Sequence, residues 1–377
     1  MHLRRWSSLL AGLALGLAAT GATADLTVSQ VAPLSGPLAP TGTHLRAGAQ
    51  LYFDTVNAAG GVHGVRLRLT TRDDGYKAAE TVRLTQLALK EDQPVALFGI
   101  VGTGNVEALL KEKTVEAAAV PVVTVRTGAS TVVGSGNPWL FVTRASYAEE
   151  IGTILRQYLP LGYRRVAIFH QDDPFGQDGL QAAEAGIKEL GGELVAKGSY
   201  EKNTTKVEAA VKAIAAANPS LVVMVSNTAA SAEFVRQFRA TGQPAQLVTI
   251  SVTDAGQVVE KIGAASAHGL AITQVVPDPG NGTIPLIREI REAMKRFPPK
   301  DAALNHTLVE GYAGAKILVE ALRRAGPSPS PGKLREALAG LRGYDAGGLP
   351  ISFSGTTRGG SHYVDITIIN GAGRLVR

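Results

Sequence analysis

The chain has 377 residues, a formal net charge of +6 and no cysteine. The lack of cysteine excludes a disulfide framework, a thiolate-ligated zinc site and a cysteine nucleophile. The basic residues are scattered, without the runs of basic and aromatic residues typical of nucleic-acid binding, so we expect no nucleic-acid partner.

The first 24 residues have the three-part order of a secretory signal peptide. Arg4 and Arg5 precede an apolar segment at 9–19, and small residues follow up to Ala24. This order predicts export and cleavage after Ala24, and the apolar segment is too short for a permanent membrane anchor. In a bacterium with two membranes, the expected compartment is the periplasm.

Strand-like and helix-like segments alternate along the rest of the chain, which is longer than one hydrophobic core usually holds. This order predicts α/β architecture, with parallel sheets covered by helices on both faces. The expected strands lie at 26–33, 65–74, 94–101, 120–125, 164–173, 192–200, 219–227, 245–251 and 268–276. The expected helices lie at 43–59, 78–90, 105–119, 177–190, 206–217, 230–241, 283–297, 302–325 and 332–341.

Two further segments complete this pattern. Segment 141–150 separates the two series of strands and is a candidate crossing point between two lobes. The tail at 359–377 alternates polar and apolar residues around the turn sequence "NGAG", which predicts a β-hairpin on a sheet edge.

The glycine-rich segment "GIVGTGNVE" at 99–107 resembles a dinucleotide-binding loop only in part. The spacing requires a third glycine where Glu107 stands, and no acid follows about 20 residues later to bind a ribose. Arg126 in that neighbourhood would suit a 2′-phosphate, so an exported NADP-type oxidoreductase stays an alternative. The backbone N–H groups of Thr103, Gly104 and Asn105, at a helix start, also suit an anion.

Similar loops follow other strands, at 33–42, 126–131 and 172–179. Ligands of open parallel sheets lie outside the carboxyl ends of the strands, so these loops predict a shared cleft for a small ligand. The sequence contains no G-x-S-x-G or H-E-x-x-H motif, and its seven histidines are scattered. We therefore expect a binding protein without enzymatic activity, cofactor or metal. Asp172, Asp173 and Asp178 are expected to cap loops.

Several motifs together resemble the type I periplasmic solute-binding proteins of the leucine/isoleucine/valine-binding family, which serve ABC importers. They include "NAAGGVHG" at 57–64, the "RDDGY" that follows at 72–76, and "RRVAIFHQDDPFGQDGL" at 164–180. The resemblance implies two αβα lobes with mostly parallel sheets, joined by a hinge. It assigns 25–143 plus 272–343 to the first lobe and 144–271 plus 344–377 to the second.

The resemblance also implies a ligand site between the lobes. The loops at 103–105 and 126–129 would take the ligand's carboxylate, and Phe175 would place its ring against the ligand. Thr228 lies where receptors of this type commonly have a tyrosine. The implied ligand-binding residues are Thr103, Gly104, Asn105, Arg126, Thr127, Gly128, Phe175, Thr228, Ser251 and Asp254.

Ser251 is the main departure from the family pattern. Amino-acid receptors have an acid near this position to neutralise the ligand's ammonium, and a buried ammonium without a partner is costly. Either Asp254 takes that role or the ligand is a small carboxylate without an amine. Arg126 is then either its ion-pair partner or an outward-facing loop residue. Tyr147 either contacts the ligand or packs the hinge.

The resemblance implies a monomeric receptor in the periplasm. It would capture a small carboxylate or an amino-acid-like solute, with branched-chain amino acids as the family default. It would deliver this solute to an ABC permease and ATPase complex in the inner membrane. A ligand-binding partner of a sensor system has the same fold and stays a second alternative.

Overall fold

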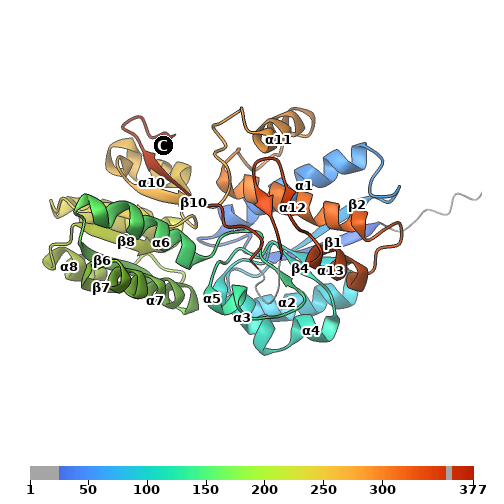
Figure 1. The fold of residues 1–377 in the computed structure, drawn as a ribbon, viewed down its shortest axis with the longest axis horizontal. Coiled ribbons are helices and arrows are strands. Elements are labelled where there is room, and N and C mark those ends of the chain that lie inside the picture. Colours follow the sequence, from blue (N-terminus) through green and yellow to red (C-terminus); the bar gives the residue numbers. More distant parts are fainter. Residues whose placement is uncertain (1–24, 354–358) are drawn as a thin grey trace, which may run out of the picture.

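The structure, a computed structural model, describes residues 25–353 and 359–377, so the predicted signal peptide at 1–24 lies outside the described residues. Two α/β lobes lie side by side along the long axis of the molecule (Figure 1). Within the described residues, every helix is too short or too polar to cross a membrane.

The first lobe is built on a parallel sheet of five strands in the order β2-β1-β3-β4-β5. The strands are β1 (Leu26–Ala32), β2 (Leu67–Asp73), β3 (Ala96–Phe98), β4 (Val122–Val123) and β5 (Leu140–Phe141). The helices are α1 (Ala39–Ala58), α2 (Ala78–Glu91), α3 (Thr103–Lys111), α4 (Thr114–Ala118), α5 (Ser130–Val133), α11 (Pro285–Arg296), α12 (His306–Arg324) and α13 (Pro331–Ala339).

The second lobe has a seven-stranded sheet in the order β14-β13-β10-β9-β8-β6-β7. Its parallel strands are β6 (Arg165–Asp172), β7 (Glu193–Glu201), β8 (Leu221–Val225), β9 (Gln246–Thr249) and β10 (Ala271–Gln274). The antiparallel edge is β13 (Asp365–Ile369) and β14 (Leu375–Val376). The helices are α6 (Tyr147–Tyr158), α7 (Pro174–Glu189), α8 (Glu208–Ala216), α9 (Thr228–Ala240) and α10 (Ala255–Ala267), and a short 3₁₀ helix (Leu159–Leu161) follows α6.

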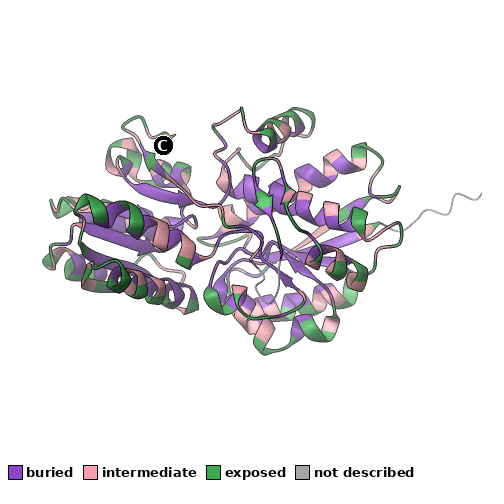
Figure 2. Cartoon of the chain, in the orientation of Figure 1, coloured by how far each residue is buried: buried purple, intermediate pink, exposed green. Residues whose placement is uncertain are grey.

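Burial of apolar side chains holds each sheet between its helices (Figure 2). All five residues of β8, "LVVMV", are buried, as expected for a central strand covered on both faces. One apolar cluster runs from α3 of the first lobe to α6 and α7 of the second. The lobes therefore share part of their hydrophobic core.

The predicted two-lobe α/β architecture is confirmed, with corrections to individual elements. Strands β3 and β4 are much shorter than expected because Gly99 and Thr124 adopt positive φ values of 66° and 61°. Pairing resumes beyond them as an isolated bridge between Val101 and Arg126. The expected helix at 105–119 is two helices, α3 and α4, and the expectations missed α5, α6 and α10. The predicted C-terminal hairpin forms, and β13 pairs with β10.

Strand pairing divides the chain between lobes at other points than the expected ones. Strand β10 continues the parallel ladder of the second lobe beside β9, although 272 onward was expected in the first lobe. The hairpin of β11 (Tyr344–Asp345) and β12 (Pro350–Ile351) was expected in the second lobe. Its apolar residues instead fill the core of the first lobe, together with Phe353.

Candidate functional site: a cavity between the lobes

A small cavity lies between the lobes, where strands of both sheets end. Its free volume is only about 10 Å³, room for about one water molecule, so the two lobes are closed tightly on each other here and a ligand needs them to move apart. Its walls come from Leu38, Tyr76, Val101, Gly102 and Arg126 of the first lobe and from Tyr147, Phe175, Asn227 and Val252 of the second. This is the expected position for a ligand of open parallel sheets, outside the carboxyl ends of the strands.

The walls of the cavity are mainly apolar and aromatic. The rings of Tyr147 and Phe175 meet edge to face with their centroids 5.2 Å apart. Burial raises the pKa of both Tyr76 and Tyr147, so both phenols stay neutral. Asn227 caps α9 through its Oδ1, which accepts from the N–H of Ala230 at 3.1 Å. The neighbouring Thr228, predicted from the sequence, does not line the cavity.

Arg126 is the charged residue of the wall and is only 4% exposed. Its Nε lies 3.2 Å from Oε2 of Glu310, and its Nη2 donates to Oγ1 of Thr307 at 3.1 Å and to the carbonyl oxygen of Ser251 at 3.3 Å. Burial lowers the pKa of Arg126, and Glu310 opposes that shift. The alternative of an outward-facing loop arginine is therefore wrong.

Glu310 connects Arg126 to a second buried pair at the crossing between the lobes. Arg144 lies 3.3 Å from Glu310 and 3.1 Å from Glu150, and it also donates to the hydroxyl of Ser251. Burial disfavours the charge on Arg144, but the two glutamates outweigh it and raise its pKa. Two arginines and two glutamates thus form a buried group without net formal charge, and the sequence pattern did not predict it.

Ser251 belongs to this buried group and does not line the cavity. Its backbone N–H donates to Oε2 of Glu150 at 2.8 Å, and its hydroxyl donates to Oε1 at 3.0 Å. The nearby Asp254 is also engaged elsewhere. It caps α10 through the N–H of Gln257 at 2.9 Å and accepts from Nδ2 of Asn305 at 2.9 Å. The carboxylate of Asp254 is therefore not part of the cavity wall, and no other acid of the described residues lines the cavity.

The two loops expected to take the ligand's carboxylate lie beside the cavity. The hydroxyls of Thr103 and Thr127 are 2.7 Å apart and bond to each other. Asn105 donates to Oγ1 of Thr81 at 2.7 Å, Gly104 faces Pro174 of the second lobe, and Gly128 accepts from the N–H of Tyr147 at 2.9 Å. Of the predicted site residues, only Arg126 and Phe175 line the cavity.

Apart from Tyr147, for which ligand contact was one of two alternatives, the other residues of the cavity wall were not predicted as ligand contacts from the sequence. Tyr76 belongs to the "RDDGY" motif, and Asn227 ends a predicted strand. Both positions could therefore have been proposed as site residues from the sequence. Tyr147 lines the cavity and also packs against Phe175. Its position is therefore compatible with both roles considered for it, contact with the ligand and packing.

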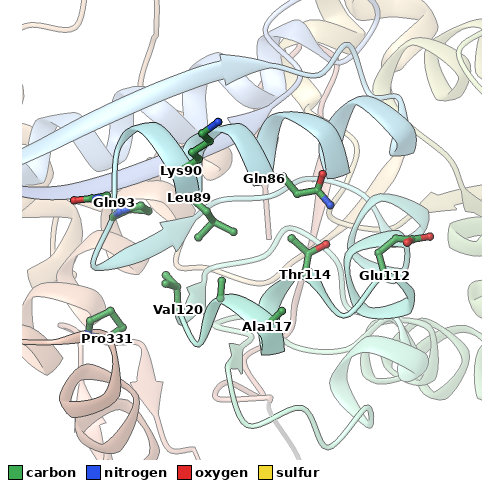
Figure 3. Close-up of a pocket in the computed structure, with 11 residues that line it drawn as sticks. Gln86, Leu89, Lys90, Gln93, Glu112, Thr114, Ala117, Val120 and Pro331 are labelled. Atoms are coloured by element: carbon green, nitrogen blue, oxygen red, sulfur yellow. The ribbon is translucent and has the colours of Figure 1, made fainter.

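A separate hollow lies on the outer side of the first lobe, between α2, α4 and the start of α13 (Figure 3). Gln86, Lys90, Glu112 and Pro331 are among its lining residues, and none of the predicted site residues is. The described ranges also contain no group of three or more His, Cys, Asp or Glu residues that could hold a metal.

The fold and this interlobe cavity define a two-lobed binding protein. The chain belongs to the periplasmic binding protein family, whose profile matches residues 25–374. Within it, the predicted resemblance to the leucine/isoleucine/valine-binding type is confirmed. The chain is 25% identical over 336 residues to "Leu/Ile/Val-binding protein homolog 7" of Brucella suis biovar 1 (strain 1330), covering 84% of this chain and 80% of that protein.

Two solved structures extend the comparison. A substrate-binding periplasmic protein from Ralstonia solanacearum is 38% identical, with a TM-score of 0.90, covering 93% of this chain and 99% of that chain. A possible leucine/isoleucine/valine-binding protein from Rhodopirellula baltica SH 1 is 27% identical, with a TM-score of 0.86, covering 95% and 98%. The family and these neighbours are binding proteins rather than enzymes.

Proposed function

We propose that the protein is a periplasmic receptor of an ABC importer. It captures a small carboxylate between its lobes and delivers it to the membrane permease. One observation carries the ligand class: Arg126 is the only charged residue among those that line the interlobe cavity. The family membership supports the receptor role.

The cavity walls favour a carboxylate without an amine. A buried ammonium needs a carboxylate partner, and the residues that line the cavity include no acid. Arg126 offers a guanidinium, which is suited to a carboxylate. The rings of Tyr76, Tyr147 and Phe175 provide an apolar surface for the rest of the ligand. We therefore infer a small aromatic or aliphatic acid, with Arg126 and Phe175 as contacts.

The first test is a thermal-shift panel on protein refolded from denaturant, which removes any ligand carried from the host. Benzoate, 4-hydroxybenzoate and hexanoate are compared with leucine, valine and glutamate, and NADPH serves as a control. A ligand at roughly a thousand times its Kd stabilises the native state by about 4 kcal/mol, which gives a clear shift. We expect shifts with the acids that lack an amine.

Each other outcome overturns a named part of the proposal. Shifts with amino acids alone would contradict the inferred ligand class and leave the receptor role intact. A shift with NADPH alone would contradict the receptor role. Deletion of the gene should abolish uptake of the ligand, whereas undiminished uptake with loss of a transcriptional response would favour the sensor alternative.

A further inference from the structure

Lys202 reaches across the cleft beside the cavity. It follows β7 in the second lobe, and its Nζ lies 3.2 Å from Oδ1 of Asn105 and 3.9 Å from the ring centroid of Tyr76, both in the first lobe. Within its own lobe, Nζ lies 3.7 Å from Oδ2 of Asp173. The side chain is 23% exposed. A lysine of one lobe is thus held mainly by partners of the other.

Tyr76, the residue that Lys202 covers, is itself a wall of the cavity. Its backbone has a φ of 62°, in the left-handed region that non-glycine residues seldom adopt. Its hydroxyl accepts from Nε2 of Gln171 in the second lobe at 3.3 Å, and its ring lies against Gly102. Two groups of the second lobe therefore fix a cavity-lining ring of the first lobe.

A cation above an aromatic ring is attracted more strongly when water is excluded, and Tyr76 is only 4% exposed. Burial lowers the pKa of Lys202, and Asp173 and Asp74 oppose that shift. The contacts of Nζ with Tyr76 and Asn105 need the two lobes to be close together, so they exist only in the closed cleft.

We propose that Lys202 is a positioning residue of the ligand site: it holds Tyr76 against the cavity from the opposite lobe and thereby slows ligand release. This inference rests on the proposed receptor function. It predicts that loss of the ammonium changes dissociation far more than association, because association starts from the open cleft where these contacts are absent.

The kinetic test compares Lys202→Met, which keeps the aliphatic stem, with Lys202→Arg, which keeps the cation. Lys197→Met is the matched control, because Lys197 lies on β7, the strand that Lys202 follows, and pairs with Glu184 of its own lobe. With benzoate as probe, we expect Lys202→Met to raise koff about tenfold and to leave kon within about twofold. Lys202→Arg and Lys197→Met should resemble the wild type. An unchanged koff, or a loss confined to kon, would overturn the proposal.

A second readout does not depend on the ligand. The chain has no cysteine, so spin labels can be placed on Ala79→Cys in α2 and Ala213→Cys in α8, two exposed positions in different lobes. Double electron–electron resonance should show longer interlobe distances in Lys202→Met than in the wild type. If none of benzoate, 4-hydroxybenzoate and hexanoate binds, the inferred ligand class fails, and the ligand-free distances alone decide. Identical distance distributions in the two proteins would then overturn the role of Lys202.

Discussion

At the scale of single residues, the pairing of Arg126 with Glu310 determines the charge of the site. Glu310 lies within 3.3 Å of both Arg126 and Arg144, and Arg144 also pairs with Glu150. All four side chains are at most 4% exposed. The carboxylate ligand that we propose would enter beside a guanidinium whose charge is already balanced within the protein, so Glu310 would limit how strongly Arg126 attracts it.

This arrangement predicts opposite effects of Glu310→Gln on stability and binding. The variant leaves two buried arginines with one glutamate, which should lower the free energy of unfolding by about 3 to 5 kcal/mol. It also removes a negative charge near the ligand, so benzoate should bind about tenfold more tightly. Urea denaturation and calorimetry measure the two effects.

Glu320→Gln is the matched control on the same helix, because Glu320 makes a more exposed pair with Arg324. This pair should contribute at most about 1 kcal/mol to the free energy of unfolding. Weaker binding of benzoate to Glu310→Gln would contradict the proposed role of Arg126 as the ligand's partner.

The residue scale also shows what the sequence could and could not predict. Arg126 and Phe175 could be predicted as site residues because each follows a recognisable strand, and ligands of open parallel sheets bind at the carboxyl ends of the strands. Glu150 and Glu310 lie within helices, where a glutamate is ordinarily exposed. Only the packing of both lobes around the crossing shows that they are buried.

At the scale of elements, close packing of α1 against α12 places Thr307 and Glu310 beside Arg126. A Cβ on Gly48 of α1 would lie 2.1 Å from the carbonyl oxygen of Leu308, and one on Gly311 of α12 would lie 2.2 Å from that of Leu45. Each helix therefore needs a glycine where it meets the backbone of the other.

Gly311→Ala should force the two helices apart and lower the free energy of unfolding by about 1 to 3 kcal/mol or more. Gly332→Ala in α13 is the control, since the nearest atom to a Cβ there is 4.0 Å away. In the control, the helix preference of alanine should leave stability equal or raise it by up to about 1 kcal/mol. Equal stabilities of the two variants would contradict this account.

Element existence was more predictable than element length. Strand-like apolar segments that alternate with helix-like segments predicted nine strands. The positive φ values of Gly99 and Thr124, which shorten β3 and β4, depend instead on tertiary contacts. Thr124, for example, packs against Gly314 of α12, far away in the sequence. Helix α6 begins with a signal that is readable in the sequence, the capping box of Ser146 and Glu149.

At the scale of the whole molecule, two further contacts join the lobes. Asp178 of α7 accepts from the N–H of Ser130 at 2.8 Å, at the start of α5. Asp254 accepts from Asn305 at 2.9 Å, and Asn305 caps α12. In both contacts a carboxylate of the second lobe meets the start of a helix in the first lobe. Stability of the molecule and closure of the cleft therefore depend on some of the same groups.

His306, the first residue of α12, lies next to one of these contacts and links stability to pH. Its Nε2 is buried and has no hydrogen-bond partner among the described residues. Burial lowers its pKa from 6.5 to about 4, with Asp278 and Asp254 opposing the shift. Between these two pH values the unfolded chain binds a proton that the folded protein does not, so stability present above pH 6.5 is lost as the pH falls towards 4.

From pH 7 to about pH 4.5, this one group should lower the free energy of unfolding by about 2 kcal/mol. Urea denaturation of His306→Gln should show a smaller loss over that range than the wild type, by about that amount. His268→Gln, at an exposed histidine after α10, is the control and should keep the wild-type pH dependence. Parallel curves for the wild type and His306→Gln would mean that His306 is protonated as readily in the folded protein as in the unfolded chain. The start of α12 would then have to be open to water, which would contradict an interlobe contact closed around it.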